Sequence, residues 1–188
     1  RYHQRMAPPA EPRLDEPDSS RTFLYFAYGS NLSSRRLRAP DRAPSAVRVA
    51  IAQAPGYRLG FDKIGSVDGS GKCDCEWTGR DVGTVVDRVW GVVWRIAAPE
   101  RGSLDRIEGK GAGYRVATIT VLTDAGPVAA MTYIATAKDP LLKPYRWYRH
   151  HVLVGAIEAR LPAAWIETIR AVEVIDDPDP ARAAIEMA

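Results

Sequence analysis

Six consecutive apolar or aromatic residues, Phe23–Tyr28, run directly into the turn-forming residues Gly29-Ser30-Asn31. A short apolar run bounded by turn residues predicts a buried β-strand, and the glycine allows the backbone to turn tightly behind it. The serines and the asparagine that follow, Ser33 included, carry side chains that cap helices, so we expect a short helix next. The first N–H groups of such a helix lack partners within it, which makes them a cradle for an anion or an oxyanion. The alternative is a core strand followed by an ordinary capped turn.

The order of apolar patterns along the chain indicates one domain of the α+β class. The chain has 188 residues, 46% of them hydrophobic, which is enough for a core. Strand patterns fill the first two thirds and helical patterns the last third. This order predicts a small mixed or antiparallel sheet, curled toward a barrel and flanked by helices. We expect the domain at 21–175, between a disordered proline-rich lead at 1–20 and a loose tail at 176–188.

The individual elements follow from the periodicity and from the positions of glycine and proline. Besides the opening strand, we expect strands at 47–52, 57–61, 73–78, 89–96, 114–121 and 128–134. We expect helices at 33–37, 100–108 and 162–171, and a long glycine-rich loop at 64–72. The segment 141–160 should start irregularly at Lys143-Pro144 and then become helical.

Charge and cysteine content limit the class of function. The net charge of +3 is a small excess, although basic residues cluster at 35–48 and at 146–151. Such clusters are either solvated surface or attract a small anionic substrate, and nucleic-acid binding is the weakest interpretation. No apolar run is long enough to span a membrane, and two cysteines suit a reducing compartment. We therefore expect a cytoplasmic protein without nucleic-acid or membrane partners.

Cys73 and Cys75 are the two cysteines, and they lie in one expected strand. Zinc needs about four ligands, and no second Cys or His pair lies at a suitable spacing. We interpret both as small buried side chains, and we expect no metal and no organic cofactor.

One carboxylate has an unusual position. Glu108 falls in the last turn of the helix expected at 100–108, directly before Gly109. The carboxyl end of a helix is already negative and opposes the ionised form of a glutamate. A carboxyl group in this position suits a general acid and base. The alternative is a solvent-exposed glutamate without a chemical role.

Three sequence blocks carry a resemblance to a known family. They are Tyr25-Phe26-Ala27-Tyr28-Gly29-Ser30-Asn31-Leu32, Val89-Trp90-Gly91-Val92-Val93-Trp94, and Leu104-Asp105-Arg106-Ile107-Glu108-Gly109 followed by Tyr114. In order and spacing these blocks resemble the γ-glutamylcyclotransferase family. A fourth block, Tyr148–Ala156, is similar to the family's later tyrosine-bearing helix. The resemblance covers roughly residues 23–171, and the combination of the first and third blocks is its specific part.

The resemblance implies a small mixed barrel with flanking helices and an enzyme that cleaves a γ-glutamyl amide without water. In this reaction the α-amine of the substrate attacks its own γ-carbonyl, which gives 5-oxoproline and releases an amine or amino acid. Glu108 matches the family's catalytic glutamate, and the turn backbone would bind the substrate carboxylate or the oxyanion. The implied substrate-binding residues are Tyr25, Phe26, Ala27, Tyr28, Gly29, Ser30, Asn31 and Tyr148. The implied partner is a small γ-glutamyl molecule, bound by a monomer or a homodimer.

Two alternatives stay open at this point. Tyr148 is either a substrate contact or a half-buried aromatic residue on a helix. The protein is either a cyclotransferase or a non-catalytic module that binds a small anionic metabolite in the same cradle. In addition, the stretch 71–75 does not follow the apolar pattern of the family. Because members of the family differ in substrate, the sequence does not identify the leaving group.

Overall fold

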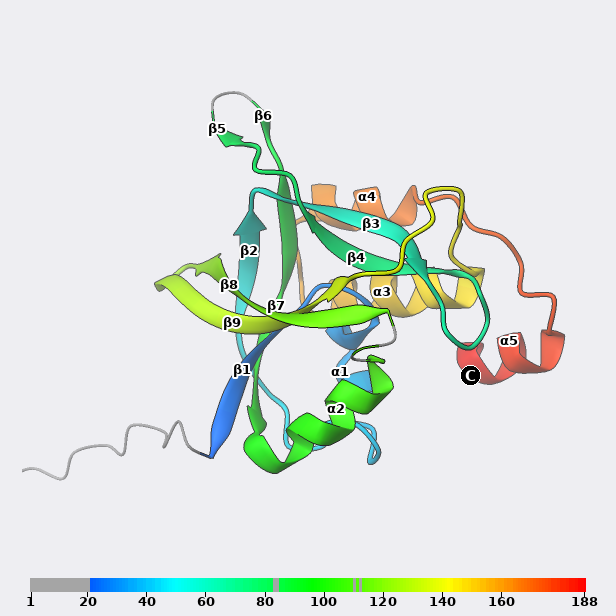
Figure 1. The fold of residues 1–188 in the computed structure, drawn as a ribbon, viewed down its shortest axis with the longest axis horizontal. Coiled ribbons are helices and arrows are strands. Elements are labelled where there is room, and N and C mark those ends of the chain that lie inside the picture. The colour runs from blue at the N-terminus through cyan, green and yellow to red at the C-terminus, as the bar shows by residue number, and fades with distance from the viewer. Residues whose placement is uncertain (1–20, 83–84, 110, 112) are drawn as a thin grey trace, which may run out of the picture.

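The computed structural model describes residues 21–82, 85–109, 111 and 113–188 (Figure 1). The disordered lead expected at 1–20 lies outside these residues. The described part consists of a β-barrel, a long β-hairpin and helices that lie beside them.

Five strands form the barrel. They are β1 (Thr22–Ala27), β2 (Val47–Pro55), β7 (Arg88–Ala97), β8 (Tyr114–Thr123) and β9 (Gly126–Ala135). Their order around the closed barrel is β1-β7-β2-β8-β9. The barrel closes where β1 runs parallel to β9, with Tyr25 opposite Met131, and its other neighbouring strands are antiparallel. The expected α+β class with a small mixed barrel is confirmed.

The contact between β1 and β7 depends on a glycine. A Cβ atom at Gly91 would lie 2.3 Å from the carbonyl oxygen of Ala27 and 2.7 Å from the ring of Phe26. Glycine therefore lets the two strands approach this closely. Both Phe26 and Ala27 are fully buried. As a result, β1 ends at a fixed point directly before the turn at Gly29.

Two hairpins extend from the barrel. β3 (Tyr57–Ile64) and β4 (Gly71–Trp77) form a separate two-stranded antiparallel sheet, and β5 (Asp81–Val82) pairs with β6 (Val85–Val86). The strands expected at 57–61 and 73–78 are confirmed. They reach further than expected, because Ile64 pairs with Gly71 and shortens the loop between them. A Cβ at Gly71 would lie 2.1 Å from the carbonyl oxygen of Phe61, so this pairing needs glycine.

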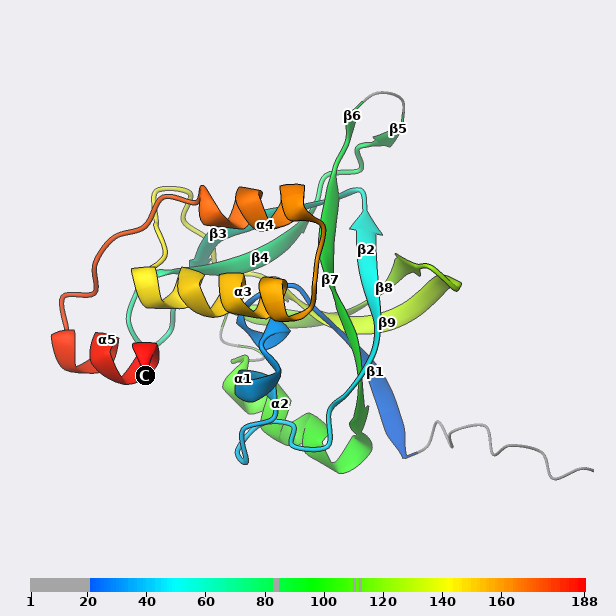
Figure 2. The same cartoon turned by 180° about the vertical axis from the view of Figure 1, so that it is seen from behind.

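The described residues form five α-helices and two 3₁₀ turns. The α-helices are α1 (Ser34–Leu37), α2 (Arg101–Ile107), α3 (Arg146–Glu158), α4 (Ala163–Arg170) and α5 (Pro180–Met187). The 3₁₀ turns are η1 (Ser30–Leu32) and η2 (Ala98–Glu100). Figure 2 shows α3 and α4 side by side, with α1 below α3 and α5 beyond its N-terminal end.

The helix expected within 141–160 is confirmed, together with its irregular start. It begins at Arg146, because Pro144 disfavours helical geometry in the residue before it and Tyr145 is extended. Pro162 caps α4 instead of belonging to it. No helix in the described ranges is long and apolar enough to cross a membrane.

The C-terminal segment is not a loose tail, and that prediction was wrong. Asp179 and Pro180 together are a helix start: the aspartate side chain accepts a hydrogen bond from the backbone N–H of Arg182 at 3.1 Å, and proline suits the first turn. The carboxylate of Asp177 pairs with the guanidinium of Arg182 and accepts a hydrogen bond from Trp147 Nε1 at 2.8 Å. Since Trp147 belongs to α3, these contacts fix α5 against the body of the protein.

Candidate active site

The turn after β1 presents backbone N–H groups. Its first internal hydrogen bond runs from the N–H of Leu32 to the carbonyl oxygen of Gly29 at 3.0 Å. The N–H groups of Ser30 and Asn31 precede that bond and have no partner within the turn. Ser33 then caps α1 by accepting a hydrogen bond from the N–H of Arg36, as expected for a short capped helix. The turn therefore has the form of the cradle inferred from the sequence.

Two close contacts hold the turn in place. A Cβ at Gly29 would lie 3.0 Å from the Cβ of Cys73 on β4. On the other side, α3 presses on the turn through Gly155, where a Cβ would lie 2.3 Å from the backbone nitrogen of Ser33 and 2.6 Å from the carbonyl carbon of Leu32. Strand β4 and helix α3 thus enclose the turn from two directions.

Glu108 lies at the end of α2 and faces this turn. Its N–H donates to the carbonyl oxygen of Leu104 at 2.9 Å, which makes it the C-terminal cap of the helix. Its Oε1 accepts a hydrogen bond from Nδ2 of Asn31 at 2.7 Å and lies 3.7 Å from a guanidinium nitrogen of Arg42. Nδ2 of Asn31 also donates to the hydroxyl of Tyr25 at 3.1 Å. The structure therefore brings the carboxylate and the turn together, with 19% of the Glu108 side chain exposed.

A small recess lies between the turn and Glu108. It measures about 20 Å³, which is room for roughly one water-sized group. Its lining residues are Tyr25, Tyr28, Gly29, Ser30, Asn31, Cys73, Glu108, Tyr114, Tyr133 and Tyr148. The five tyrosines are buried, and burial raises the pKa of each phenol above its ordinary value. These rings therefore stay neutral and act as walls and hydrogen-bonding groups.

The tyrosine hydroxyls are held by fixed partners. Tyr28 donates to the backbone carbonyl of Tyr133, and Tyr114 donates to the carbonyl of Cys73 at 2.6 Å. The hydroxyl of Tyr148 accepts a hydrogen bond from the N–H of Cys73 at 3.1 Å. Tyr148 on α3 is therefore buried rather than half-buried, and it lines the recess; its contact with a substrate stays a prediction.

Both cysteines are buried, as the sequence predicts, and neither forms a disulfide. Burial raises the pKa of the Cys73 thiol and of the Cys75 thiol, which keeps both protonated and weakly nucleophilic. Within the part of the chain that the structure describes, no group of three or more His, Cys, Asp and Glu side chains could hold a metal ion.

A larger outer cavity of about 240 Å³ adjoins the recess. The two share four residues, which are Ser30, Glu108, Tyr114 and Tyr148. The outer cavity adds the charged side chains of Arg36, Arg42, Lys63, Asp68, Lys72, Arg182 and Glu186. A molecule in the outer cavity can thus reach both Glu108 and the turn, and it meets mostly basic side chains.

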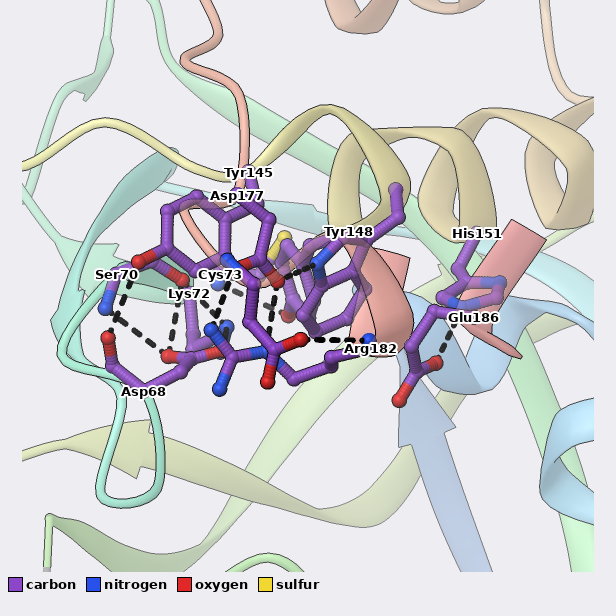
Figure 3. A network of polar contacts seen from close by, with 12 residues as sticks. Asp68, Ser70, Lys72, Cys73, Tyr145, Tyr148, His151, Asp177, Arg182 and Glu186 are labelled. Carbon is purple, nitrogen blue, oxygen red and sulfur yellow. Dashed lines mark hydrogen bonds and ion pairs between the residues drawn. The ribbon is translucent and has the colours of Figure 1, made fainter. Parts of the chain in front are cut away.

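One wall of the outer cavity comes from the stretch 71–75 that departs from the family pattern. The ammonium group of Lys72 pairs with Asp68 at 2.7 Å and lies 4.8 Å from the ring centre of Tyr148 (Figure 3). Figure 3 also shows Arg182 beside Asp177, and Glu186 beside His151. Helix α5 therefore contributes to this cavity, a contribution that the sequence analysis missed with the helix itself.

Not every expected site residue reaches the site. Phe26 and Ala27 are 0% exposed and line neither the recess nor the outer cavity. They lie at the end of β1, where the strand pairs with Val93 and Val92 of β7 and both of its faces are covered. Conversely, the sequence analysis missed Arg42, Lys63 and Tyr133. Arg42 had a signal in the basic cluster at 35–48, whereas Lys63 and Tyr133 carried none.

Comparison with known proteins agrees with the fold. A family model described as the AIG2-like family matches residues 88–169. Gamma-glutamylcyclotransferase of Mus musculus is 36% identical over 158 residues, which cover 81% of this chain and 79% of that protein. The Homo sapiens protein of the same name is 34% identical over 166 residues, covering 85% and 83%. A solved structure named gamma-glutamyl cyclotransferase has a TM-score of 0.75 at 29% identity and covers 88% of this chain and 98% of that one.

The mixed barrel, the glycine turn and the facing carboxylate define an enzyme with the γ-glutamylcyclotransferase fold. The chain belongs to the γ-glutamylcyclotransferase family, as its sequence blocks indicate. The cytoplasmic location and the monomeric or homodimeric state stay predictions.

Proposed function

We propose that this enzyme converts a γ-glutamyl amine or γ-glutamyl amino acid to 5-oxoproline and releases the amine, with Glu108 as general acid and base. The observation that carries the proposal is the position of the Glu108 carboxylate, 2.7 Å from the side chain of Asn31 in the turn. The names of the mouse and human relatives support the same reaction class.

The reaction needs one proton carrier and no water. The α-amine nitrogen attacks the γ-carbonyl carbon, so a C–N bond forms within the substrate and closes a five-membered ring. Glu108 takes a proton from this nitrogen and later gives a proton to the leaving nitrogen when the amide C–N bond breaks. Because both reacting groups belong to one molecule, the main task of the site is to hold the substrate in a folded conformation.

The turn would stabilise the negative charge of the substrate. The N–H groups of Ser30 and Asn31, which have no partner within the turn, suit either the α-carboxylate or the oxyanion that develops on the γ-carbonyl. The recess of about 20 Å³ is large enough for one such oxygen-bearing group but not for the whole substrate. The outer cavity of about 240 Å³ would then hold the leaving amine.

The proposal is tested by Glu108→Gln. This substitution keeps the size of the side chain and its packing at the end of α2, but the amide cannot carry a proton. We expect 5-oxoproline release to fall by roughly 10²- to 10⁴-fold, with the melting temperature nearly unchanged. The matched control is Glu167→Gln, because Glu167 is 66% exposed on α4 and lines neither cavity. Normal 5-oxoproline release by the Glu108→Gln enzyme would refute the assignment.

A further inference from the structure

Arg42 lies beside the pair that Glu108 forms with Asn31. Only 15% of the Arg42 side chain is exposed. One of its guanidinium nitrogens, Nη1, donates to Oδ1 of Asn31 at 3.4 Å and lies 3.7 Å from Oε1 of Glu108. The same oxygen of Glu108 accepts the hydrogen bond from Nδ2 of Asn31 at 2.7 Å. The three side chains therefore form a closed triangle of polar contacts.

This triangle gives the carboxamide of Asn31 one favourable orientation. A guanidinium group has only donors, and an ionised carboxylate has only acceptors. Oδ1 must therefore face Arg42, and Nδ2 must face Glu108. Asn31 is 3% exposed, so bulk water has little access to replace either partner. Without the guanidinium group, Oδ1 would lose this donor and the carboxamide would be freer to turn away from Glu108.

The loop that carries Arg42 is held by its own backbone. The N–H of Arg42 donates to the carbonyl oxygen of Ala39 at 2.9 Å, and the N–H of Ala43 donates to the carbonyl oxygen of Leu37 at 3.0 Å. Both Leu37 and Ala43 are fully buried. These contacts do not involve the Arg42 side chain. The loop thus presents the guanidinium group from a fixed base and should keep its course when that side chain is replaced.

Arg42 stands apart from the space in which the substrate would react. It lines the outer cavity but not the recess between the turn and Glu108. Burial lowers the pKa of Arg42 and the charge of Arg36 acts in the same direction, whereas the charge of Glu108 opposes both. An arginine nevertheless keeps its proton in a protein, so Arg42 is a permanent donor and not a proton carrier.

We propose that Arg42 is a positioning residue: by donating to Oδ1 of Asn31 it turns Nδ2 toward Glu108 and so holds the carboxylate where it exchanges protons with the substrate. The inference rests on the proposed function. It gives Arg42 no part in the proton transfers and no contact with the substrate, so Arg42 should act on kcat and hardly on KM.

Single substitutions test this split. The assay measures 5-oxoproline release from γ-glutamyl-alanine and from γ-glutamyl-ethylamine, beside a thermal melt. Arg42→Met has no donor, and we expect kcat to fall by about 10- to 100-fold while KM stays within about threefold. Arg42→Lys keeps a donor for Oδ1 and should recover part of the lost kcat. Arg170→Met is the matched control, since Arg170 is 52% exposed, pairs with Glu167 on α4 and lines neither cavity.

A double-mutant cycle tests whether Arg42 acts through Asn31. If it does, the two substitutions are not additive, because the carboxamide that Arg42 orients is already absent from Asn31→Ala. In the Asn31→Ala background, Arg42→Met should then lower kcat by less than about threefold. Arg42→Lys takes its place in the cycle should the methionine variant fold poorly.

The outcomes separate this inference from the proposed function. If the unaltered enzyme releases 5-oxoproline from neither compound, the proposed function fails and the inference fails with it. If Arg42→Met raises KM and leaves kcat unchanged, Arg42 binds the substrate and only the inference is overturned. The inference is also overturned if Arg42→Met lowers kcat by the same factor with and without Asn31, or if Arg42→Lys is no more active than Arg42→Met.

Discussion

Gly155→Ala tests whether the packing of α3 against the turn controls the chemistry. The added Cβ would lie 2.3 Å from the backbone nitrogen of Ser33 and 2.6 Å from both the carbonyl carbon and the Cβ of Leu32. Real Cβ atoms essentially never approach closer than 3.0 Å, and the obstructing atoms are backbone or the first side-chain atom. They cannot rotate away, so helix and turn must separate by about 1 Å to restore ordinary contact distances.

The expected effect on stability is modest. Overpacking of this kind costs about 1–3 kcal/mol, and the helix propensity of alanine over glycine offsets up to about 1 kcal/mol of it. A net loss of about 1–2 kcal/mol lowers the melting temperature of a chain of this size by only a few degrees. The effect on activity is larger, because a shift of about 1 Å in a positioning group can cost roughly 100-fold in rate.

The assay is kcat/KM for 5-oxoproline release, measured beside a thermal melt. Gly102→Ala is the matched control, since a Cβ at this position of α2 meets only a flexible arginine atom at 3.8 Å. The control should melt slightly higher and keep full activity. If Gly155→Ala also melts higher and keeps full activity, the turn is not held by α3 and the reasoning fails.

Two further predictions concern the neighbours of the site. Asn31→Ala removes the donor shared by Glu108 and Tyr25, so we expect 5-oxoproline turnover to fall by about tenfold or more; unchanged turnover would contradict a positioning role. Burial lowers the pKa of His151 in the folded protein below its ordinary value of 6.5, despite the pairing with Glu186. The unfolded chain then binds a proton near that pH that the folded chain does not, so the free energy of unfolding decreases as the pH falls through about 6.5. The melting temperature should therefore change less between about pH 8 and about pH 5.5 for His151→Gln than for the unaltered protein. An equal change in melting temperature for the two proteins would exclude this contribution of His151.

The parts of the fold that local patterns determine could be predicted from the sequence. The run Phe23–Tyr28 predicts a buried strand, and Gly29 directly after it predicts the turn. In the same local way, Pro99 before α2 and Gly109 after it mark the two ends of that helix. The same signals exist at Asp179-Pro180, but the acidic and proline-rich sequence around them suggested a tail. Helix α5 therefore shows that capping signals deserve more weight than average composition over a short segment.

The parts of the site that depend on long-range packing could not be predicted. Nothing near Lys63 in the sequence shows that it is buried and lines the outer cavity, because its neighbours Tyr114 and Glu108 come from elements some fifty residues away. Likewise, Phe26 and Ala27 share a motif with the turn, but β7 covers them and removes them from the cavity. A motif fixes which residues are adjacent in the chain, whereas the tertiary fold decides which of them face a ligand.

The separation of the β3–β4 hairpin from the barrel has an evolutionary consequence. Glu108 and the turn are carried by elements that the barrel core holds in place, while Lys63 and Lys72 belong to a two-stranded sheet outside it. On the proposed function, substitutions at Lys63 and Lys72, which line only the outer cavity, would change which compound is accepted, whereas Cys73 of β4 also packs against the turn. Divergence among relatives would then be tolerated first at these outer-cavity positions, and their exchange offers a direct way to engineer a new preference.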